Sequence, residues 1–411
     1  MWKYIAKRLG QMIILFYVFV ALLFLILDLQ PGDISQQFVG NPDIPPEAKQ
    51  ILIQNLGLDQ PKHIQLWNHL KNYSTFNLGQ SWDSFPREVS DILFEALPRT
   101  LFLFLSATLL SFWLGFYTGK VVAWKRGSFL EKGVMATSIF FWTVFYPWFA
   151  LLMLWLFAFQ IGWFPIGKFI TLDFASRPDW VNSISSSIGE VSGNTTVGGW
   201  VGAPVDANSI FNGILISIVV ATAAYGLIRF AIDRQVDAEA TRRTWHRFGL
   251  IGVFVGLSAY WIVNSNAVYA FDILWHTVVP VMTLTMVNYA ATTLLMRSSM
   301  LETLREDYIL TARAKGVPDK VVRDKHAARN ALLPVTTSLV LALATVIGGG
   351  VITEQIFSWP GLGRALLTAI TVEDIPVAMG ALAIIGVLSL LAHLVADILY
   401  AFLDPRIRFQ G

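Results

Sequence analysis

Long runs of apolar residues, separated by polar segments, dominate the chain. Eight of these runs come close to the roughly 20 residues that an α-helix needs to cross about 30 Å of hydrocarbon. They lie at 9–29, 100–122, 134–160, 211–231, 247–264, 277–296, 333–353 and 377–402. The pattern predicts an all-α, polytopic membrane protein with about eight transmembrane helices.

The composition favours the same fold class. The 411 residues are 55% hydrophobic and only 14% charged, which is too apolar for ordinary soluble domains. The chain has no Cys, which excludes disulfides, thiol catalysis and Cys-ligated metals. The basic N-terminus resembles that of a signal peptide, but a long apolar run follows it without a small-residue cleavage site, so we expect an uncleaved first span.

Lys and Arg residues predict the orientation, because short basic loops stay in the cytoplasm. Lys3, Lys7 and Arg8 place the N-terminus inside. With eight spans both termini are cytoplasmic, and the remaining basic clusters fall on the same side: Lys120, Lys125, Arg126, Lys132, Arg234, Arg242, Arg243, Arg247, the block at 306–334, Arg406 and Arg408. A six-span alternative without 211–231 and 247–264 would leave the cluster at 242–247 outside.

Several kinds of chemistry find no support in the sequence. There is no G-x-x-x-x-G-K-[ST] loop to hold nucleotide phosphates, and the six His show no metal-ligand spacing. Asp397 and His393 are the main ionisable residues deep in a predicted span. A proton-driven carrier would show a richer relay of such groups, so we favour a helix-packing role for this pair.

Polar side chains in the sixth and seventh predicted spans are candidates to line a pathway for a polar solute. The polar residues of these two spans are Thr283, Thr285, Asn288, Thr292, Thr293, Thr336, Thr337, Ser338 and Thr345, and we single out Thr285, Asn288, Thr292, Thr337 and Thr345 as pathway residues. Hydrogen bonding between helices is the alternative role for such side chains.

The densest charge in the chain lies between Glu306 and Pro334. We expect the helix of the sixth span to continue from Ser299 to Leu310, and a second helix to run from about Pro318 to Arg329, ahead of the next span. Gly316 favours a helix stop, and Pro318 and Asp319 suit the first turn of a new helix.

This helix–turn–helix elbow carries three small residues, Ala312, Ala314 and Gly316. We expect them to be exposed, so that the surface of another protein can approach closely. The alternatives are therefore a partner-docking elbow and a solvated connector.

The elbow resembles a known motif. "TARAKG", Thr311 to Gly316, is similar to the loop motif of permeases of ATP-binding-cassette (ABC) importers. "EDYILTARAKG" with "HAARNALLP" resembles the peptide/nickel family of these permeases, which imports dipeptides and oligopeptides. Leu310 and Arg329 depart from the general motif, which has Glu and Pro there, but the departures also resemble the peptide subgroup. Further similar stretches are "LQPGD", "LGLDQP", "NLGQSW", "LPRTL", "FSWPGLGRALLTAI", "DIPV" and "LDPRIR".

The resemblance implies a transport subunit of the plasma membrane and not an enzyme. Its expected partners are the lipid bilayer, a second homologous permease, two ATPase subunits and an extracytoplasmic substrate-binding protein, with no nucleic acid. ATP and magnesium would bind the ATPases, and this chain would bind no cofactor or metal. The same architecture imports oligosaccharides or nickel chelates, so these are alternative cargoes. A stand-alone secondary carrier and a membrane enzyme are alternatives from other classes.

The resemblance also assigns residues and segments. The coupling residues that would fit a groove on an ATPase are Ala312, Arg313, Ala314, Lys315, Gly316, Val317, Pro318 and Asp319. The family has six spans, so 166–270 would be an inserted external loop with two extra spans. The expected divisions are 1–99, 100–165, 166–270 and 271–411, with the coupling loop at 298–332. The turn Trp359–Gly363 would lie near the binding protein or the pathway mouth, or simply join two helices.

Overall fold

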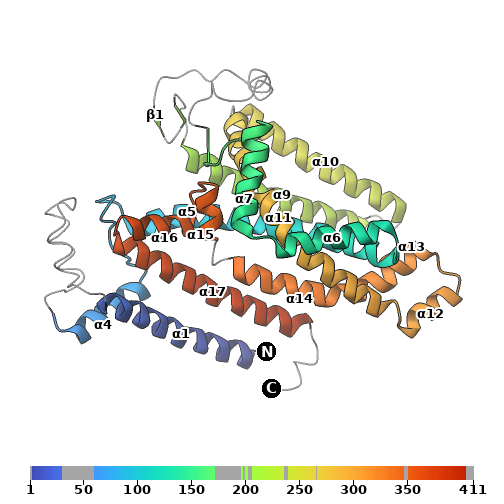
Figure 1. Ribbon diagram of the computed structural model, residues 1–411, viewed down its shortest axis with the longest axis horizontal. Helices are drawn as coiled ribbons and strands as arrows, with labels where there is room; N and C mark the ends of the chain where they lie inside the picture. The colour runs from blue at the N-terminus through green and yellow to red at the C-terminus, as the bar shows by residue number, and fades with distance from the viewer. Residues whose placement is uncertain are drawn as a thin grey trace. The chain divides into compact units, whose positions relative to one another are not determined.

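The computed structural model describes residues 2–29, 60–171, 196–197, 200–201, 206–235, 239–264, 266–346 and 350–403. The chain divides into two compact units. Unit 1 consists of Met1–Leu152 and Pro280–Gly411, and unit 2 of Met153–Val279. Helices make up most of both units (Figure 1).

Unit 1 holds a bundle of long helices. Its helices are α1 (Trp2–Asp28), α4 (Lys62–Ser74), α5 (Val89–Trp124), α6 (Phe129–Thr143), most of α7 (Tyr146–Leu154), most of α11 (Ala267–Thr303), α12 (Asp307–Ala314), α13 (Asp319–Val321), the π-helix η3 (Val322–Ala327), α14 (Ala328–Val346), α15 (Val351–Ile356), α16 (Leu362–Thr371) and α17 (Ile375–Leu403). α17 packs against α1, α5, α14 and α16. Val20, Leu93, Leu362 and Ala381, from four of these helices, are fully buried in one apolar cluster.

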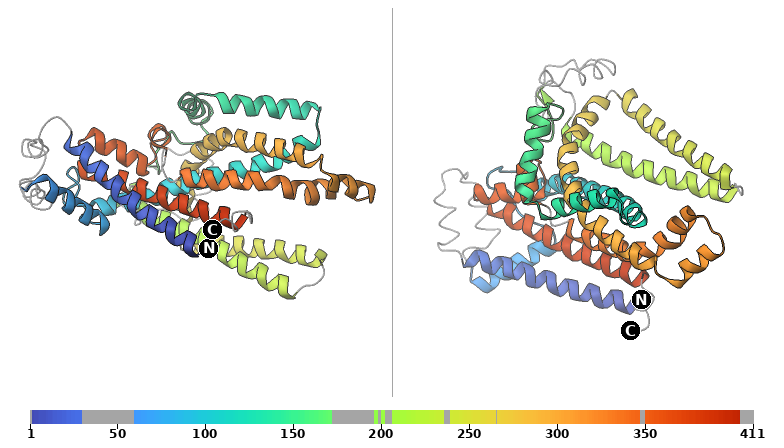
Figure 2. Two further views of the ribbon diagram at one scale, coloured as in Figure 1. Left: turned by 90° about the horizontal axis from the view of Figure 1, so that it is seen from below. Right: turned by 45° about the vertical axis from the view of Figure 1, so that its right-hand side comes forward.

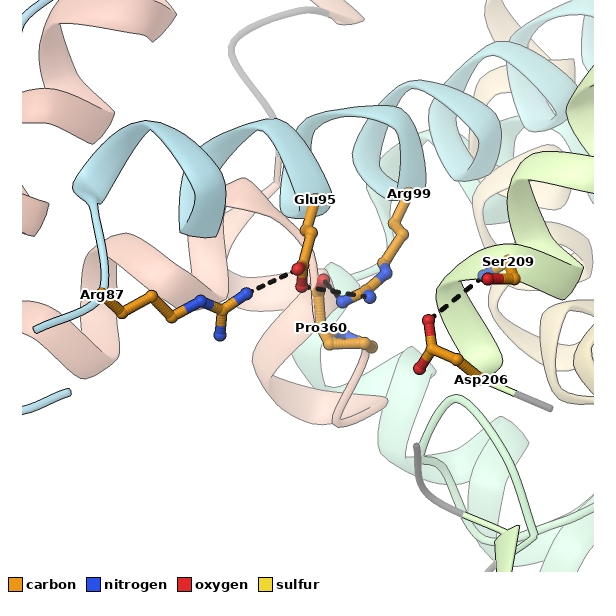
Figure 3. A network of polar contacts seen from close by, with 6 residues as sticks. All are labelled: Arg87, Glu95, Arg99, Asp206, Ser209 and Pro360. Atoms are coloured by element: carbon orange, nitrogen blue, oxygen red, sulfur yellow. Dashed lines mark hydrogen bonds and ion pairs between the residues drawn. The ribbon is translucent and has the colours of Figure 1, made fainter. Parts of the chain in front are cut away.

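Unit 2 holds the π-helix η1 (Trp155–Gln160), the strands β1 (Thr196–Val197) and β2 (Trp200–Val201), α9 (Ala207–Gln235), α10 (Glu239–Val263) and the start of α11. β1 and β2 pair antiparallel. α9 and α10 pack side by side, and Trp261 Nε1 donates a hydrogen bond to Ser217 Oγ at 3.1 Å. The carboxylate of Asp206 accepts a hydrogen bond from the backbone N–H of Ser209 at the start of α9 (Figure 3).

Among the described residues, six helices are long and apolar enough to cross a membrane: α1, α5, α9, α10, α11 and α17. The number is seven if the bent pair from Phe129 to Gln160 counts as one span. The prediction of an all-α polytopic protein is confirmed. The number of spans and the side on which the termini lie stay predictions.

Two predicted spans are not single helices. The run at 134–160 is bent by 107° where α6 ends at Thr143. Val144 is extended there, and Pro147 lies in the first turn of α7, where its missing N–H leaves no hydrogen bond unmade. The run at 333–353 is covered by α14, which ends at Val346, and by the separate α15. The three glycines at 348–350 disfavour a continuous helix.

Within unit 1, the elbow and the turn at Trp359–Gly363 occupy opposite ends (Figure 1). The start of α1 and the end of α17 lie toward the end that carries α12 and α13 (Figure 2). Asp397 on α17 pairs there with Arg8 on α1, with 3.2 Å between its Oδ2 and Arg8 Nε. This ion pair supports the helix-packing role expected for Asp397.

At the opposite end, the turn at Trp359–Gly363 is pinned against α5. Trp359 and Leu362 are fully buried. Arg99 donates a hydrogen bond to the carbonyl oxygen of Pro360 at 3.3 Å and also lies beside Glu95, which pairs with Arg87 (Figure 3). Because the large side chains of the turn are buried, the structure favours a turn that joins two helices over a partner surface.

Glu354 on α15 holds the same turn from inside. Its side chain is fully buried and accepts hydrogen bonds from Thr100 Oγ1 at 2.7 Å and from the backbone N–H of Arg364 at 2.8 Å. Burial raises the pKa of Glu354. The carboxyl group therefore links α5, α15 and the first turn of α16.

Candidate functional site

The elbow is built from two helical arms and a tight turn. The first arm is α12, and the second begins with α13. Gly316 between them has a φ of +74°, in the left-handed region that glycine adopts without strain. The backbone N–H of Val317 donates to the carbonyl oxygen of Ala312 at 3.2 Å, and that of Val321 to Pro318 at 2.8 Å. The interruption expected at Gly316–Asp319 is present.

Both arms differ from their expected lengths. The helix of the sixth span does not continue from Ser299 to Leu310, because α11 ends at Thr303 and α12 starts at Asp307. The second arm does not end near Arg329, because α13, η3 and α14 follow one another to Val346. Pro334 lies inside α14, and the one backbone hydrogen bond that it removes does not end the helix.

The inner face of α12 is packed, which corrects the expectation that Ala312 is exposed. Ala312 and Ile309 are buried in an apolar cluster with Val322, Ala328 and Met300. A larger side chain than alanine would not fit this contact without displacing a neighbour. The small size of Ala312 therefore serves packing within the chain.

The tip of the elbow is exposed. Its exposed residues are Arg313, Ala314, Lys315, Gly316, Pro318 and Asp319, whereas Val317 is half-buried. A Cβ atom added at Gly316 would meet no atom within 4 Å. The tip thus presents small side chains and a few charges to its surroundings.

Ion pairs join the second arm to α5. Asp324 on η3 accepts two hydrogen bonds of 2.9 Å from Arg323, and its Oδ1 lies 3.1 Å from Nζ of Lys120. These partners lower the pKa of Asp324 from 3.8 to about 2, with the hydrogen bonds from Arg323 as the largest cause. Arg313 on the first arm stacks over Trp124 at the end of α5, 5.4 Å from the ring centre. The elbow is therefore in direct contact with α5.

A second ion pair near this end joins α6 to α11. Glu131 accepts a hydrogen bond from Arg297 Nε at 2.9 Å and another from the backbone N–H of Gly127. The run Ser128-x-x-Glu131 is a capping-box signature that indicates the start of α6, and Ser128 does accept a hydrogen bond from the N–H of Glu131. Nothing in the sequence pointed to Arg297 as the partner.

The predicted pathway residues separate in the structure. A cavity of about 290 Å³ between α5, α11 and α14 is lined by Asn288 and Thr292. Thr285 is buried outside the lining, with its hydroxyl 3.5 Å from the carbonyl oxygen of Ala107. Thr337 donates to the carbonyl oxygen of Leu333 and is also outside the lining. The side chain of Thr345 is not among those described.

Ser338 on α14, another polar residue of the seventh predicted span, also lines this cavity. Thr108 and Ser111 on α5 line it as well and were not among the predicted residues. Their positions come from the packing of three helices that lie far apart in the sequence, which an apolar run does not reveal. No group of three His, Asp or Glu side chains in the described part of the chain lies close enough to hold a metal ion.

Comparison with known proteins covers almost the whole sequence. Residues 111–409 match the family described as "Binding-protein-dependent transport system inner membrane component", and residues 1–104 match its N-terminal part. A di/tripeptide transport system permease protein of Pseudomonas aeruginosa is 30% identical over 410 residues, all of both chains. An oligopeptide transport system permease protein of Bacillus subtilis is 28% identical over 99% of each chain.

The match to the family extends over well more than half of the chain and includes the elbow, and the described helices suit a multi-pass protein of the inner, or plasma, membrane. The chain belongs to the family of binding-protein-dependent transport system inner membrane components.

Proposed function

We propose that this chain is the membrane-spanning subunit of an ATP-driven importer of short peptides. Its role is transport and not catalysis, since the sequence has no phosphate-binding loop of its own. Two partner ATPases bind ATP and magnesium, a second homologous permease completes the pathway, and an extracytoplasmic binding protein delivers the cargo. The printed names of the relatives, di/tripeptide and oligopeptide permeases, support peptides as the cargo.

The exposed tip of the elbow is the observation that carries this proposal. Ala314 to Asp319 form a protrusion that offers small side chains to a groove on an ATPase. Closure of the ATPase pair around ATP moves the tip. Lys120 and Trp124 then transmit the displacement to α5, and the continuous helix from Asp319 to Val346 transmits it to α14. The bundle alternates in this way between inward-open and outward-open states.

The substitution Gly316→Asp tests the coupling role. The new side chain meets no atom of this chain, but it adds bulk and negative charge to the docking surface. We expect the variant to insert into the membrane and to assemble. ATP-driven uptake should fall by about tenfold or more, which corresponds to a loss of about 1.4 kcal/mol in the binding free energy between the elbow and the ATPase. Uptake and ATP hydrolysis are measured in the complete transporter in liposomes.

The matched control is Gly79→Asp. Gly79 has a φ of +82°, and a Cβ atom added there would also meet no atom within 4 Å. Both substitutions therefore introduce the same backbone strain and the same charge, but only one lies on the elbow. Uptake at the wild-type rate by Gly316→Asp, or an equal loss in both variants, would contradict the coupling role.

The cargo is tested by measuring which solutes the associated binding protein retains. Retention of di- to oligopeptides is the expected result. Retention of oligosaccharides or nickel chelates in place of peptides would contradict the proposed peptide cargo but would leave the coupling role of the elbow unaffected.

A further inference from the structure

The cavity between α5, α11 and α14 differs chemically from the helix contacts around it. Its polar side chains are Thr108, Ser111, Asn288, Thr292 and Ser338, and its apolar walls include Phe104 and Phe112. The described residues that line it include no Asp, Glu, Lys or Arg. The cavity thus offers uncharged hydrogen-bonding groups next to aromatic rings.

Four of these polar side chains lack a hydrogen-bond partner within the described part of the chain. They are Thr108, Asn288, Thr292 and Ser338, one or two from each helix. Thr108 is only 6% exposed and Thr292 is half-buried, whereas Asn288 and Ser338 are exposed. The polar groups of these four side chains are therefore free to form hydrogen bonds with a solute that enters the cavity.

Neighbouring hydroxyls on the same helices behave differently. Ser106 donates to the carbonyl oxygen of Leu103, and Thr118 donates to that of Leu114. On α14, Thr336 donates to the carbonyl oxygen of Leu333. These are the backbone contacts that Ser and Thr ordinarily make in membrane helices. Thr108 and Ser338 differ from these neighbours, because their hydroxyls make no such contact among the described residues and line the cavity.

The close packing of α5 on α11 fixes one wall. A Cβ atom at Gly115 would lie 2.6 Å from Cβ of Thr292, so the two helices approach as closely as a glycine permits. Thr292 is held by this contact on its methyl side. Its hydroxyl remains without a partner in the described residues and belongs to the cavity lining.

We infer that this cavity is the part of the translocation pathway that contacts the backbone of the cargo. Peptide amide groups are uncharged donors and acceptors, as are the side chains that line the cavity. Such a lining accepts short peptides through their amide groups and does not select by side-chain charge, while Phe104 and Phe112 contact apolar side chains. This inference rests on the proposed peptide-import function and adds the residues and the chemistry of recognition.

A charge placed in the cavity tests the inference. The substitution Ser338→Asp adds a carboxylate where cargo would pass, so the variant should favour Ala-Lys over Ala-Glu. Cells that carry the whole transport system are given labelled Ala-Glu and Ala-Lys, and the ratio of their uptake rates is compared with the wild type. We expect the ratio of Ala-Glu uptake to Ala-Lys uptake to fall by about tenfold, as for charges roughly 12 Å apart at an effective dielectric constant near 20.

The ratio isolates the cavity from other steps, because the binding protein and the ATPases are the same in both strains. Asn77→Asp, at an exposed position outside α5, α11 and α14, is the control and should leave the ratio unchanged. An unchanged ratio in Ser338→Asp would overturn the inference, since a sealed cavity keeps the carboxyl group protonated and out of contact with cargo.

A second pair of variants keeps the inference testable if Ser338→Asp fails to insert. Thr292→Val removes a cavity hydroxyl at nearly constant volume, and Thr336→Val removes one that is bonded to its own helix. Loss of one neutral hydrogen bond to cargo predicts uptake of Ala-Ala lowered by about threefold to tenfold in Thr292→Val alone. Equal uptake in both variants overturns the inference. Absence of peptide uptake in the wild type would instead refute the proposed function.

Discussion

Asp324 is the residue that most directly ties the elbow to the transmembrane helices. It contacts Arg323 on its own arm and Lys120 on α5, and Lys120 is the more buried partner, with a side chain 12% exposed. A carboxylate held by two cations at partly buried positions stabilises the fold more than an isolated surface pair does. Asp324 therefore joins the second arm of the elbow to α5, and in the proposed mechanism it belongs to the link between them.

Removal of this charge is expected to destabilise the protein. Asp324→Asn keeps the size of the side chain but weakens both ion pairs, so the free energy of unfolding should fall by about 1 kcal/mol. Thermal unfolding of the purified protein in detergent measures the change. Asp319→Asn, at an exposed position on the tip, is the control and should have little effect.

The effect of Asp324 should also depend on pH. Its pKa falls from 3.8 to about 2 in the folded protein, so the folded state favours the ionised form. The stabilisation is complete above pH 3.8 and is lost as the pH falls toward 2. The difference in unfolding between wild type and Asp324→Asn should shrink over that range. A difference that is the same at pH 6 and at pH 2 would contradict this account.

The sequence predicted some residues well and others wrongly. The helix end at Gly316 could be predicted, because glycine is the residue that adopts the left-handed backbone conformation found there without strain. Ala312 was expected to be exposed because small residues suit both docking and packing, and only the fold separates these roles. The Lys120–Asp324 ion pair joins residues about 200 positions apart in the sequence, and no local sequence pattern predicts such a contact.

At the scale of elements, Glu354 organises the junction of α5, α15 and α16. Its carboxyl group fills the space beside Gly361 and Gly363, at the first turn of α16. A Cβ atom at Gly361 would lie 2.3 Å from Oε1 of Glu354 and 2.5 Å from Oγ1 of Thr100. The glycine is therefore needed for the close approach of the turn to the carboxyl group.

Gly361→Ala should disrupt this junction. The added methyl group forces Glu354 and Thr100 apart, and overpacking of this kind costs about 1–3 kcal/mol. The melting temperature should fall accordingly. Gly133→Ala is the matched control, because Gly133 lies on an exposed face of α6 with no atom within 4 Å of an added Cβ. Alanine there should be neutral or slightly stabilising, and an equal loss in both variants would contradict the role of Gly361.

Apolar runs predicted the existence of the long helices better than their ends. Six of the eight runs are covered by uninterrupted helices of membrane length. The bend between Thr143 and Tyr146 was missed although Pro147 signals a helix start there, because the apolar character continues across it. The continuation of α14 through Pro334 was also missed, because a proline usually indicates a helix end. Here the helix tolerates Pro334, which removes only one backbone hydrogen bond.

At the scale of the whole molecule, the eight-span topology remains a prediction that labelling can test. The chain has no Cys, so a single Cys in place of Ala238, between α9 and α10, is the only labelled position and shows on which side of the membrane it lies. Reaction with an impermeant maleimide only after the cytoplasmic face is opened would support eight spans. Reaction from outside intact cells would support six, with 211–231 and 247–264 outside the membrane.

The proposed insertion at 166–270 is testable by the same measurement. α9 and α10 form a packed pair within unit 2, which suits two extra spans that fold against each other.

The central claim is that the tip of the elbow docks on a partner ATPase. The most direct test is a photo-activatable crosslinker on a single Cys at Ala314, with Thr371→Cys on an exposed position of α16 as the control. In membranes that contain the whole transport system, the account predicts a crosslink from position 314 to an ATP-binding subunit and none from position 371. No such product from 314, or an equal yield from both positions, would contradict it.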